Sequence, residues 1–290
     1  RGMILDLEPE KVKEILLDIG YYRLGFYWNP FEINTNHQFQ EGTLFSNAVT
    51  LYYLDVDLRN LLLKYLNRIE INFRTKIVYY VSNKYKSSPT WFINPRVINP
   101  SYIKTIGKYY NDDFKRTNKT IKLHHSNNIN DLYAPAWKTL EFFTFGAVLK
   151  TYKSLNDNDL KVKIANLYGV LNLSKFINLF DTIVYVRNTC AHGGVLFDFM
   201  TPKGIALLPS ISFNGNNRHS LDSAIKIITF VLKSISNDRK NDLENDLNTL
   251  FLKHSENEVI KEIMTIRNLY LLLYCLIFEP ESKSTCYEFA

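Results

Sequence analysis

The sequence has little of several residue types that mark common protein classes. Three cysteines, Cys190, Cys275 and Cys286, are too few for a disulfide framework, so we expect a reducing, cytoplasmic setting. We find no secretory signal. The apolar run Leu269–Phe278 is too short to span a membrane, and we interpret it as a core helix. With 11 Gly against 19 Tyr and 19 Phe, the composition favours packed helices over a turn-rich β fold.

Motifs that identify several large enzyme classes are also missing. The chain has no GxxxxGK[ST] or GxGxxG phosphate loop, no HExxH, no paired CxxC and no GxSxG. Kinase, dehydrogenase, zinc-peptidase and serine-hydrolase functions therefore have no support. We expect no small-molecule cofactor and no resident metal.

Apolar residues at helical spacing predict an all-α protein with one long loop. The loop is expected over Gly193–Ser220, directly after a helix that carries Arg187 and is capped by Ser174. Phe45–Lys86 is the longest helical pattern and predicts either two helices or one bent helix. The other predicted helices are Glu8–Ile19, Ser101–Arg116 with Ser101 as its cap, Ala134–Leu155, Asp157–Tyr168, Leu221–Ser236, Leu243–His254 and Glu256–Phe278.

Positive charge suggests a polyanionic partner. The net charge is +6 and the pI about 9.0, although many basic proteins bind no nucleic acid. The segment Lys115–Asn130 is basic and polar, and we interpret it either as a mobile loop that touches RNA phosphates or as a plain solvated loop. Its candidate RNA-binding residues are Lys115, Arg116, Lys119, Lys122, His124 and His125.

The stretch Thr182–Val195, TIVYVRNTCAHGGV, contains the strongest functional pattern. Arg187 and His192 are five positions apart, which leaves their side chains about 140° apart on an ideal helix. Asn188 and His192 are four apart and share one face. The following two glycines predict a helix end, where a histidine near neutral pH is suited to act as both acid and base.

A purely structural interpretation of this pattern is also open at this point. His192 would then cap a helix end while Arg187 pairs with a carboxylate. The aromatic stretch Tyr21–Phe31 has two interpretations as well, an RNA-stacking surface or core packing around Arg23. The pair Glu70 and Arg74, four apart on a helix, is expected to be structural.

Several stretches together resemble the Abi family of bacterial abortive-infection proteins, which are linked to phage defence. They occur in the family's order and cover most of residues 10–195. The matching blocks are IGYYRLGFYWNPF at 19–31, FQEGTLFSNAVTLYYLDVDLRNLLLKYLNRIEINFRTKI at 39–77, APAWKTLEFFTFGAVLKTY at 134–152 and VRNTCAH at 186–192.

The resemblance implies a relative of the HEPN ribonucleases, helical proteins whose R-x4-6-H motif cuts RNA without a metal. It implies a HEPN-like bundle with an N-terminal helical region over residues 1–130 and a region over 131–290 that carries RNTCAH, either as two regions or as one continuous domain. Arg187 and His192 would be catalytic and Asn188 auxiliary. The most direct function is a ribonuclease of a phage-defence or toxin–antitoxin kind. A protein that holds a non-coding RNA without cutting it is the alternative, and an interaction scaffold is a third.

HEPN sites usually combine two motifs, and only one occurs here, because no other arginine has a histidine five to seven residues after it. We therefore expect a homodimer with the two helix ends facing each other, with Val184, Tyr185 and Val195 helping to bury the contact. RNA, as substrate or as bound partner, is the other expected ligand, and no membrane contact is expected.

Overall fold

The structure, a computed structural model, describes residues 2–33, 36–213 and 217–266. These residues form helices joined by loops, with isolated β-bridges and no β-strand among them, which confirms the all-α prediction. The helices are α1 Pro9–Ile19, α2 Tyr21–Gly25, η1 Asn29–Phe31, α3 Phe45–Lys84, η2 Trp91–Ile93, α4 Pro100–Ile103, η3 Ile106–Lys108, α5 Asp112–Thr117, α6 Lys119–Asn127, α7 Ala136–Thr139, η4 Leu140–Phe142, α8 Phe145–Lys153, α9 Asn158–Asn166, α10 Leu173–Ala191, α11 Leu221–Ile235, α12 Asn237–Leu252 and α13 Glu258–Ile266.

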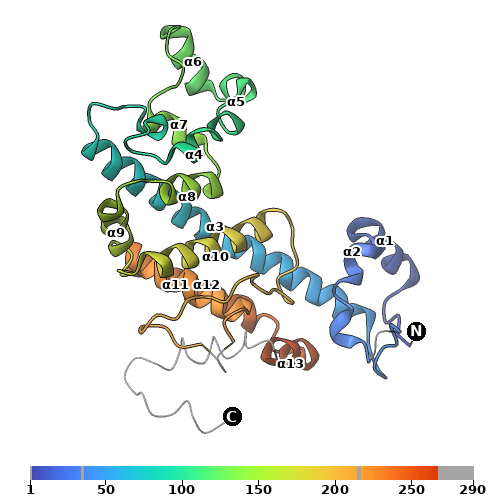
Figure 1. Ribbon diagram of the computed structural model, residues 1–290. Helices are drawn as coiled ribbons and strands as arrows, with labels where there is room; N and C mark the ends of the chain where they lie inside the picture. The colour runs from blue at the N-terminus through green and yellow to red at the C-terminus, as the bar shows by residue number, and fades with distance from the viewer. Residues whose placement is uncertain (1, 34–35, 214–216, 267–290) are drawn as a thin grey trace.

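The 40-residue helix α3 is the axis of the molecule (Figure 1). It is one helix rather than two, because it contains no glycine or proline to interrupt it. Its apolar stripe, which includes Leu58, Leu62, Ile69, Phe73 and Ile77, is buried along most of its length. Burial of this stripe against several partner helices stabilises it.

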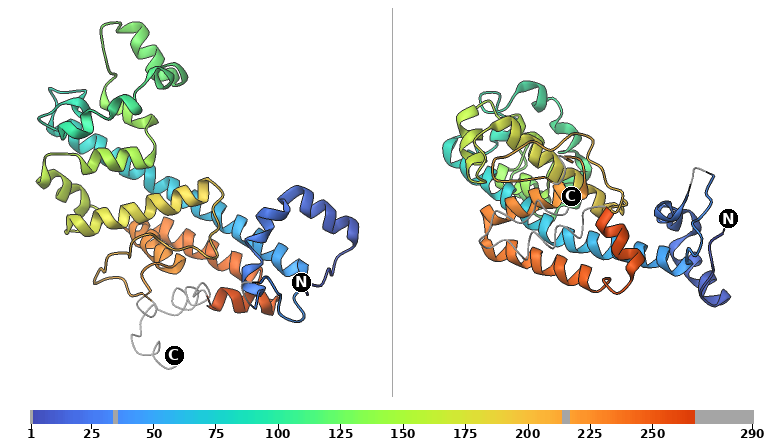
Figure 2. Two further views of the ribbon diagram at one scale, coloured as in Figure 1. Left: turned by 45° about the vertical axis from the view of Figure 1, so that its right-hand side comes forward. Right: turned by 90° about the horizontal axis from the view of Figure 1, so that it is seen from below.

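Four helices make the central bundle. Helix α3 contacts α10, α11 and α12, and α11 also packs against α10 and α12. The two further views show α1 and α2 at one end of α3 and α4–α7 at the other (Figure 2). No described helix combines the length and the apolar character that crossing a membrane requires.

Side-chain caps explain where several predicted helices actually begin. Asn172, and not Ser174, caps α10 by accepting the Lys175 amide, and Asn99 takes the role predicted for Ser101. In both helices an asparagine two positions before the predicted serine supplies the capping oxygen, and a carboxamide oxygen caps a helix at least as well as a hydroxyl.

Two predicted helices are wrong because internal caps divide them. Asn111 accepts the Phe114 amide and starts α5, so the predicted helix 101–116 becomes α4, η3 and α5. Thr144 accepts the Ala147 amide and starts α8, so 134–155 becomes α7, η4 and α8. A capping side chain ends one hydrogen-bond ladder and begins the next.

The predicted basic loop over 115–130 is also wrong, since residues 112–117 and 119–127 are helical. Ile121 and His124 are buried and anchor α6 to the core. Because most of their neighbours in the sequence are polar, this short amphipathic pattern was not recognised as a helix. The helices predicted over 8–19, 157–168 and 221–236 are confirmed within two residues.

The rest of the C-terminal third follows the prediction in part. The long loop after α10 is confirmed in its described residues, and an antiparallel bridge joins Met200 to Ser220 near its ends. Helix α12 begins six residues earlier than predicted, at Asn237. Within 256–278 the structure describes α13 up to Ile266, so the predicted core helix at 269–278, with Cys275, lies outside the described residues, as does Cys286.

Candidate functional site

Helix α10 ends where the glycines predicted. Ala191 is its last residue and His192 its C-cap, with Gly193 at φ +69° in the left-handed region that favours glycine. Gly194 must also lack a side chain, because a Cβ there would lie 2.5 Å from Cγ2 of Thr189. The chain therefore turns sharply and leaves the His192 side chain exposed at the helix end.

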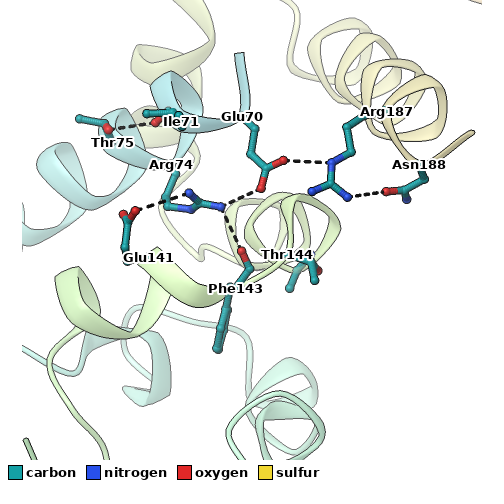
Figure 3. A network of polar contacts seen from close by, with 10 residues as sticks. Glu70, Ile71, Arg74, Thr75, Glu141, Phe143, Thr144, Arg187 and Asn188 are labelled. Atoms are coloured by element: carbon teal, nitrogen blue, oxygen red, sulfur yellow. Dashed lines mark hydrogen bonds and ion pairs between the residues drawn. The ribbon is translucent and has the colours of Figure 1, made fainter. Parts of the chain in front are cut away.

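Arg187 lies on another face of α10 and turns inward, where its side chain is 24% exposed. Its Nε donates to Oε2 of Glu70 at 3.1 Å, and its Nη1 donates to Oδ1 of Asn188 at 3.2 Å (Figure 3). These two acceptors fix the plane of the guanidinium.

Glu70 is shared between two arginines. Arg74 Nη2 donates to Oε1 of Glu70 at 2.8 Å and to the carbonyl oxygen of Phe143 at 3.1 Å. Figure 3 shows the resulting row, which runs from α10 across α3 to the segment before α8. The Glu70–Arg74 pair was predicted as structural, but its contact with Arg187 was not predicted.

A second network holds the turn after His192. Arg59 on α3 donates to the carbonyl oxygen of Gly194 at 3.0 Å, and Arg23 on α2 donates to that of Gly193. Both carbonyls lie at the negative end of the α10 macrodipole, where cationic donors are favoured. We call these contacts, together with those of Asp55, the α10 clamp.

Asp55 is the buried centre of the clamp, with 2% of its surface exposed. One carboxylate oxygen accepts the backbone amides of Leu196 and Phe197, both at 2.8 Å. The other accepts the Tyr27 hydroxyl at 2.8 Å and is paired with Arg59. A carboxylate with this many donors is satisfied despite its burial.

The contacts of the α10 clamp were not predicted from the sequence. One signal could have found it: Asp55 and Arg59 are four apart within the apolar stripe of α3, as Glu70 and Arg74 are. Charged pairs in a buried stripe need partners from elsewhere in the fold.

The structure does not bring the Arg187 and His192 side chains of one chain together, as the angle between them predicted. Asn188 connects the two in part, because its side chain contacts Arg187 and its carbonyl accepts the His192 amide at 3.0 Å. Both features of the structural interpretation are present as well, since His192 caps the helix and Arg187 pairs with a carboxylate. Geometry alone thus leaves both interpretations standing.

The predicted RNA-binding residues of α5 and α6 lie away from this site. Both helices project at the end of α3 opposite α2, whereas α10 ends next to α2 (Figures 1 and 2). Lys115 and Arg116 pair with Asp112 and Asp113, at 3.7 and 2.6 Å. Lys119 and Lys122 are exposed on α6.

The adjacent histidines of α6 have structural contacts. His124 is buried and lies 3.0 Å from Asp131, and His125 is hydrogen-bonded to Tyr110 at 2.7 Å. Burial, followed by the charges of His124 and Lys115, lowers the pKa of His125. His125 is therefore a poor cationic ligand for phosphate at neutral pH.

The aromatic stretch 21–31 divides between its two interpretations. Tyr27 and Phe31 are buried in the core, whereas Tyr22 and Phe26 are exposed, and Arg23 contacts Gly193 instead.

The described residues contain no group of three or more His, Cys, Asp or Glu side chains that could hold a metal ion.

The fold and this site define an all-α bundle protein in which one helix ends in an R-x4-H motif. The chain belongs to the family described as Abi-like protein, whose model matches residues 14–198 and so includes Arg187, Asn188 and His192. The match supports a role in abortive infection, a form of phage defence. No curated protein and no solved structure matches the chain.

Proposed function

We propose that this Abi-like protein is a metal-independent endoribonuclease of abortive infection. One observation carries the proposal: α3 holds the R-x4-H helix end through two contacts, Arg59 with Gly194 and Glu70 with Arg187. His192 is exposed there, and Glu70 and Asn188 orient the Arg187 guanidinium. A rigid, preorganised arrangement of this kind is what transition-state stabilisation requires.

The chemistry is an in-line transfer within the RNA strand. The 2′-hydroxyl attacks the adjacent phosphorus and loses its proton, and the 5′-oxygen leaves and gains one, which gives a 2′,3′-cyclic phosphate and a 5′-hydroxyl end. His192 transfers these protons. Arg187 stabilises the negative charge on the phosphoryl oxygens, for which a planar guanidinium is well shaped.

The active unit is proposed to be a homodimer. A single chain presents Arg187 and His192 on diverging faces, so a twofold axis beside Gly193 would bring one residue of each kind from each protomer into one cleft. Of the apolar residues expected at this contact, Tyr185 is exposed, while Val184 and Val195 are half-buried.

The test is cleavage of RNA by purified protein with EDTA present. We expect cutting to continue, to yield 2′,3′-cyclic phosphate ends, and to be lost in Arg187→Ala and in His192→Ala. Arg68→Ala and His37→Ala, at exposed positions away from the motif, are the matched controls. Cutting by Arg187→Ala at the parental rate would overturn the assignment.

One observation favours a second function, an RNA-binding protein that does not cut. Arg187 is already engaged by a carboxylate, so the single chain holds a half-site whose charge is partly neutralised. Sequencing the RNA that copurifies with wild type and with His192→Ala separates the two functions. Identical intact RNA in both preparations supports holding, and RNA that is trimmed only with wild type supports cutting.

A further inference from the structure

A surface hollow opens beside His192. Its lining comes from one face of α10, through Tyr185 and Thr189, and from the loop that follows, through Asp198, Phe199 and Met200. Its volume is about 480 Å³, within the roughly 300–1,000 Å³ of small-ligand sites. The hollow thus has room for a ligand of nucleotide size directly against the candidate acid–base residue.

The wall of the hollow is aromatic and fixed. The Tyr185 side chain is 41% exposed, and its ring packs against that of Phe199 with centroids 5.4 Å apart. Phe199 is buried beneath it, and Met200 is exposed at the margin. A ring that is both supported from behind and open to solvent is suited to stack on a flat ligand.

The lining of the hollow suits a nucleobase better than a phosphate group. Among the described residues that line the hollow, none is a lysine or an arginine. The described lining therefore offers a phosphate group no cationic side chain to pair with, whereas an uncharged nucleobase needs none. The RNA backbone must then pass on the Arg187 side of the helix end, with the base turned toward Tyr185.

We propose that this hollow is a nucleobase subsite, in which a base next to the scissile phosphate stacks on Tyr185. This inference rests on the proposed ribonuclease function, adds to it the recognition of a single-stranded substrate, and assigns Tyr185 to the RNA instead of to the contact between protomers. Because stacking is available only to an unpaired base, the subsite restricts cutting to loops and single strands.

The test uses single-stranded RNA with one 2-aminopurine, a base whose fluorescence falls on stacking. Binding is measured in an Arg187→Ala background, in which the proposed function predicts that the RNA is not cut. Cutting is measured in the parent protein. Three changes are compared: Tyr185→Ala, Tyr185→Phe and, as a matched control, Tyr79→Ala, which removes another exposed tyrosine at a distant position on α3.

We expect Tyr185→Ala to raise both Kd and KM about tenfold or more, the loss typical of a removed stacking partner, with kcat changed less than twofold. The 2-aminopurine quenching should disappear, and the base preference at the cut sites should weaken. Tyr185→Phe and Tyr79→Ala should behave like their parent proteins.

Two results would overturn the subsite. The first is unchanged binding, quenching and cut-site preference in Tyr185→Ala. The second is conversion of a dimer to a monomer by Tyr185→Ala when sized without RNA, which would make the hollow a contact between protomers. Failure of the proposed function is distinguishable, because wild type would then cut no RNA while the binding and quenching measurements still report on the hollow.

Discussion

The guanidinium of Arg59 donates a hydrogen bond to the carbonyl oxygen of Gly194 at 3.0 Å, across 135 positions of the sequence. This contact joins the central helix α3 to the turn directly after His192. It is one part of the α10 clamp, in which Asp55 and Arg59 are both buried. The position of the candidate acid–base residue thus depends on two charges in the core.

Asp55→Asn should destabilise the protein by about 3–5 kcal/mol, because it leaves the buried Arg59 without its counter-charge. Urea unfolding followed by circular dichroism measures the change. Asp55→Leu with Arg59→Met should recover part of the loss, since neither buried charge then remains. Glu14→Gln, which breaks an exposed pair with Lys11, is the control and should leave the unfolding midpoint unchanged. An Asp55→Asn midpoint equal to that of wild type would contradict the clamp.

Glu70→Gln should separate RNA binding from cutting. Glu70 orients Arg187 by accepting a hydrogen bond from the Arg187 Nε, and Glu70 itself is buried. We therefore class Glu70 as a positioning residue. Cutting at saturating RNA should slow about tenfold or more, as for other residues that orient a reactive group. Affinity should hold or increase, because one negative charge beside Arg187 is gone.

The control for Glu70→Gln is Glu141→Gln, which alters an exposed carboxylate 3.9 Å from Arg74. It should leave both kcat and Kd unchanged. If Glu70→Gln slows cutting only in proportion to a loss of folded protein, measured by thermal unfolding, its role is structural and the positioning role is wrong.

Coexpression of two inactive chains tests whether protomers share a site. Arg187→Ala and His192→Ala each remove half of the motif, so a mixed dimer retains one intact Arg187 and one intact His192 from different chains. We expect the mixture to recover measurable cutting while either variant alone has none. A wild-type protein that sizes as a monomer without RNA and still cuts would contradict the dimer.

Cys190 provides a chemical probe of the clamp. Burial raises the pKa of its thiol to about 12, so roughly one thiol in ten thousand is ionised at pH 8. Iodoacetamide should leave Cys190 unmodified in the folded protein, as judged by mass spectrometry of its peptide. Arg59→Ala should speed the modification by loosening the adjacent turn, whereas Arg68→Ala should not. Rapid modification in wild type would show that the helix end is open.

The sequence was most informative where one signal dominated. The unbroken apolar stripe over 45–86 predicted two helices or one bent helix, and the structure has one helix, Phe45–Lys84. The glycine pair after His192 predicted a helix end, which is present. The predictions failed at Asn111 and Thr144, where a cap divides a continuous apolar pattern. Periodicity records which residues are buried, but it does not record a change in helix axis.

The candidate site was predictable only along α10. The spacing predicted that the Arg187 and His192 side chains diverge, and the structure does not bring them together. Glu70 is 117 positions from its partner Arg187, and Asp55 is 141 positions from the Leu196 amide that it accepts. Which carboxylate meets which donor depends on how α3 and α10 are packed. Patterns in a single sequence carry local information, so they do not predict contacts between residues more than 100 positions apart.

Because Glu70, Asp55 and Arg59 all lie on α3, the register between α3 and α10 decides whether their contacts with the motif form. Glu70 binds Arg187, and Asp55 with Arg59 binds the chain from Gly194 to Phe197, so α10 runs antiparallel to α3 and is fixed at two heights. A slip of one helical turn, about 5.4 Å, would break every one of these bonds together. The contacts of Glu70, Asp55 and Arg59 with α10 and the turn after it therefore form together, in one register of the two helices.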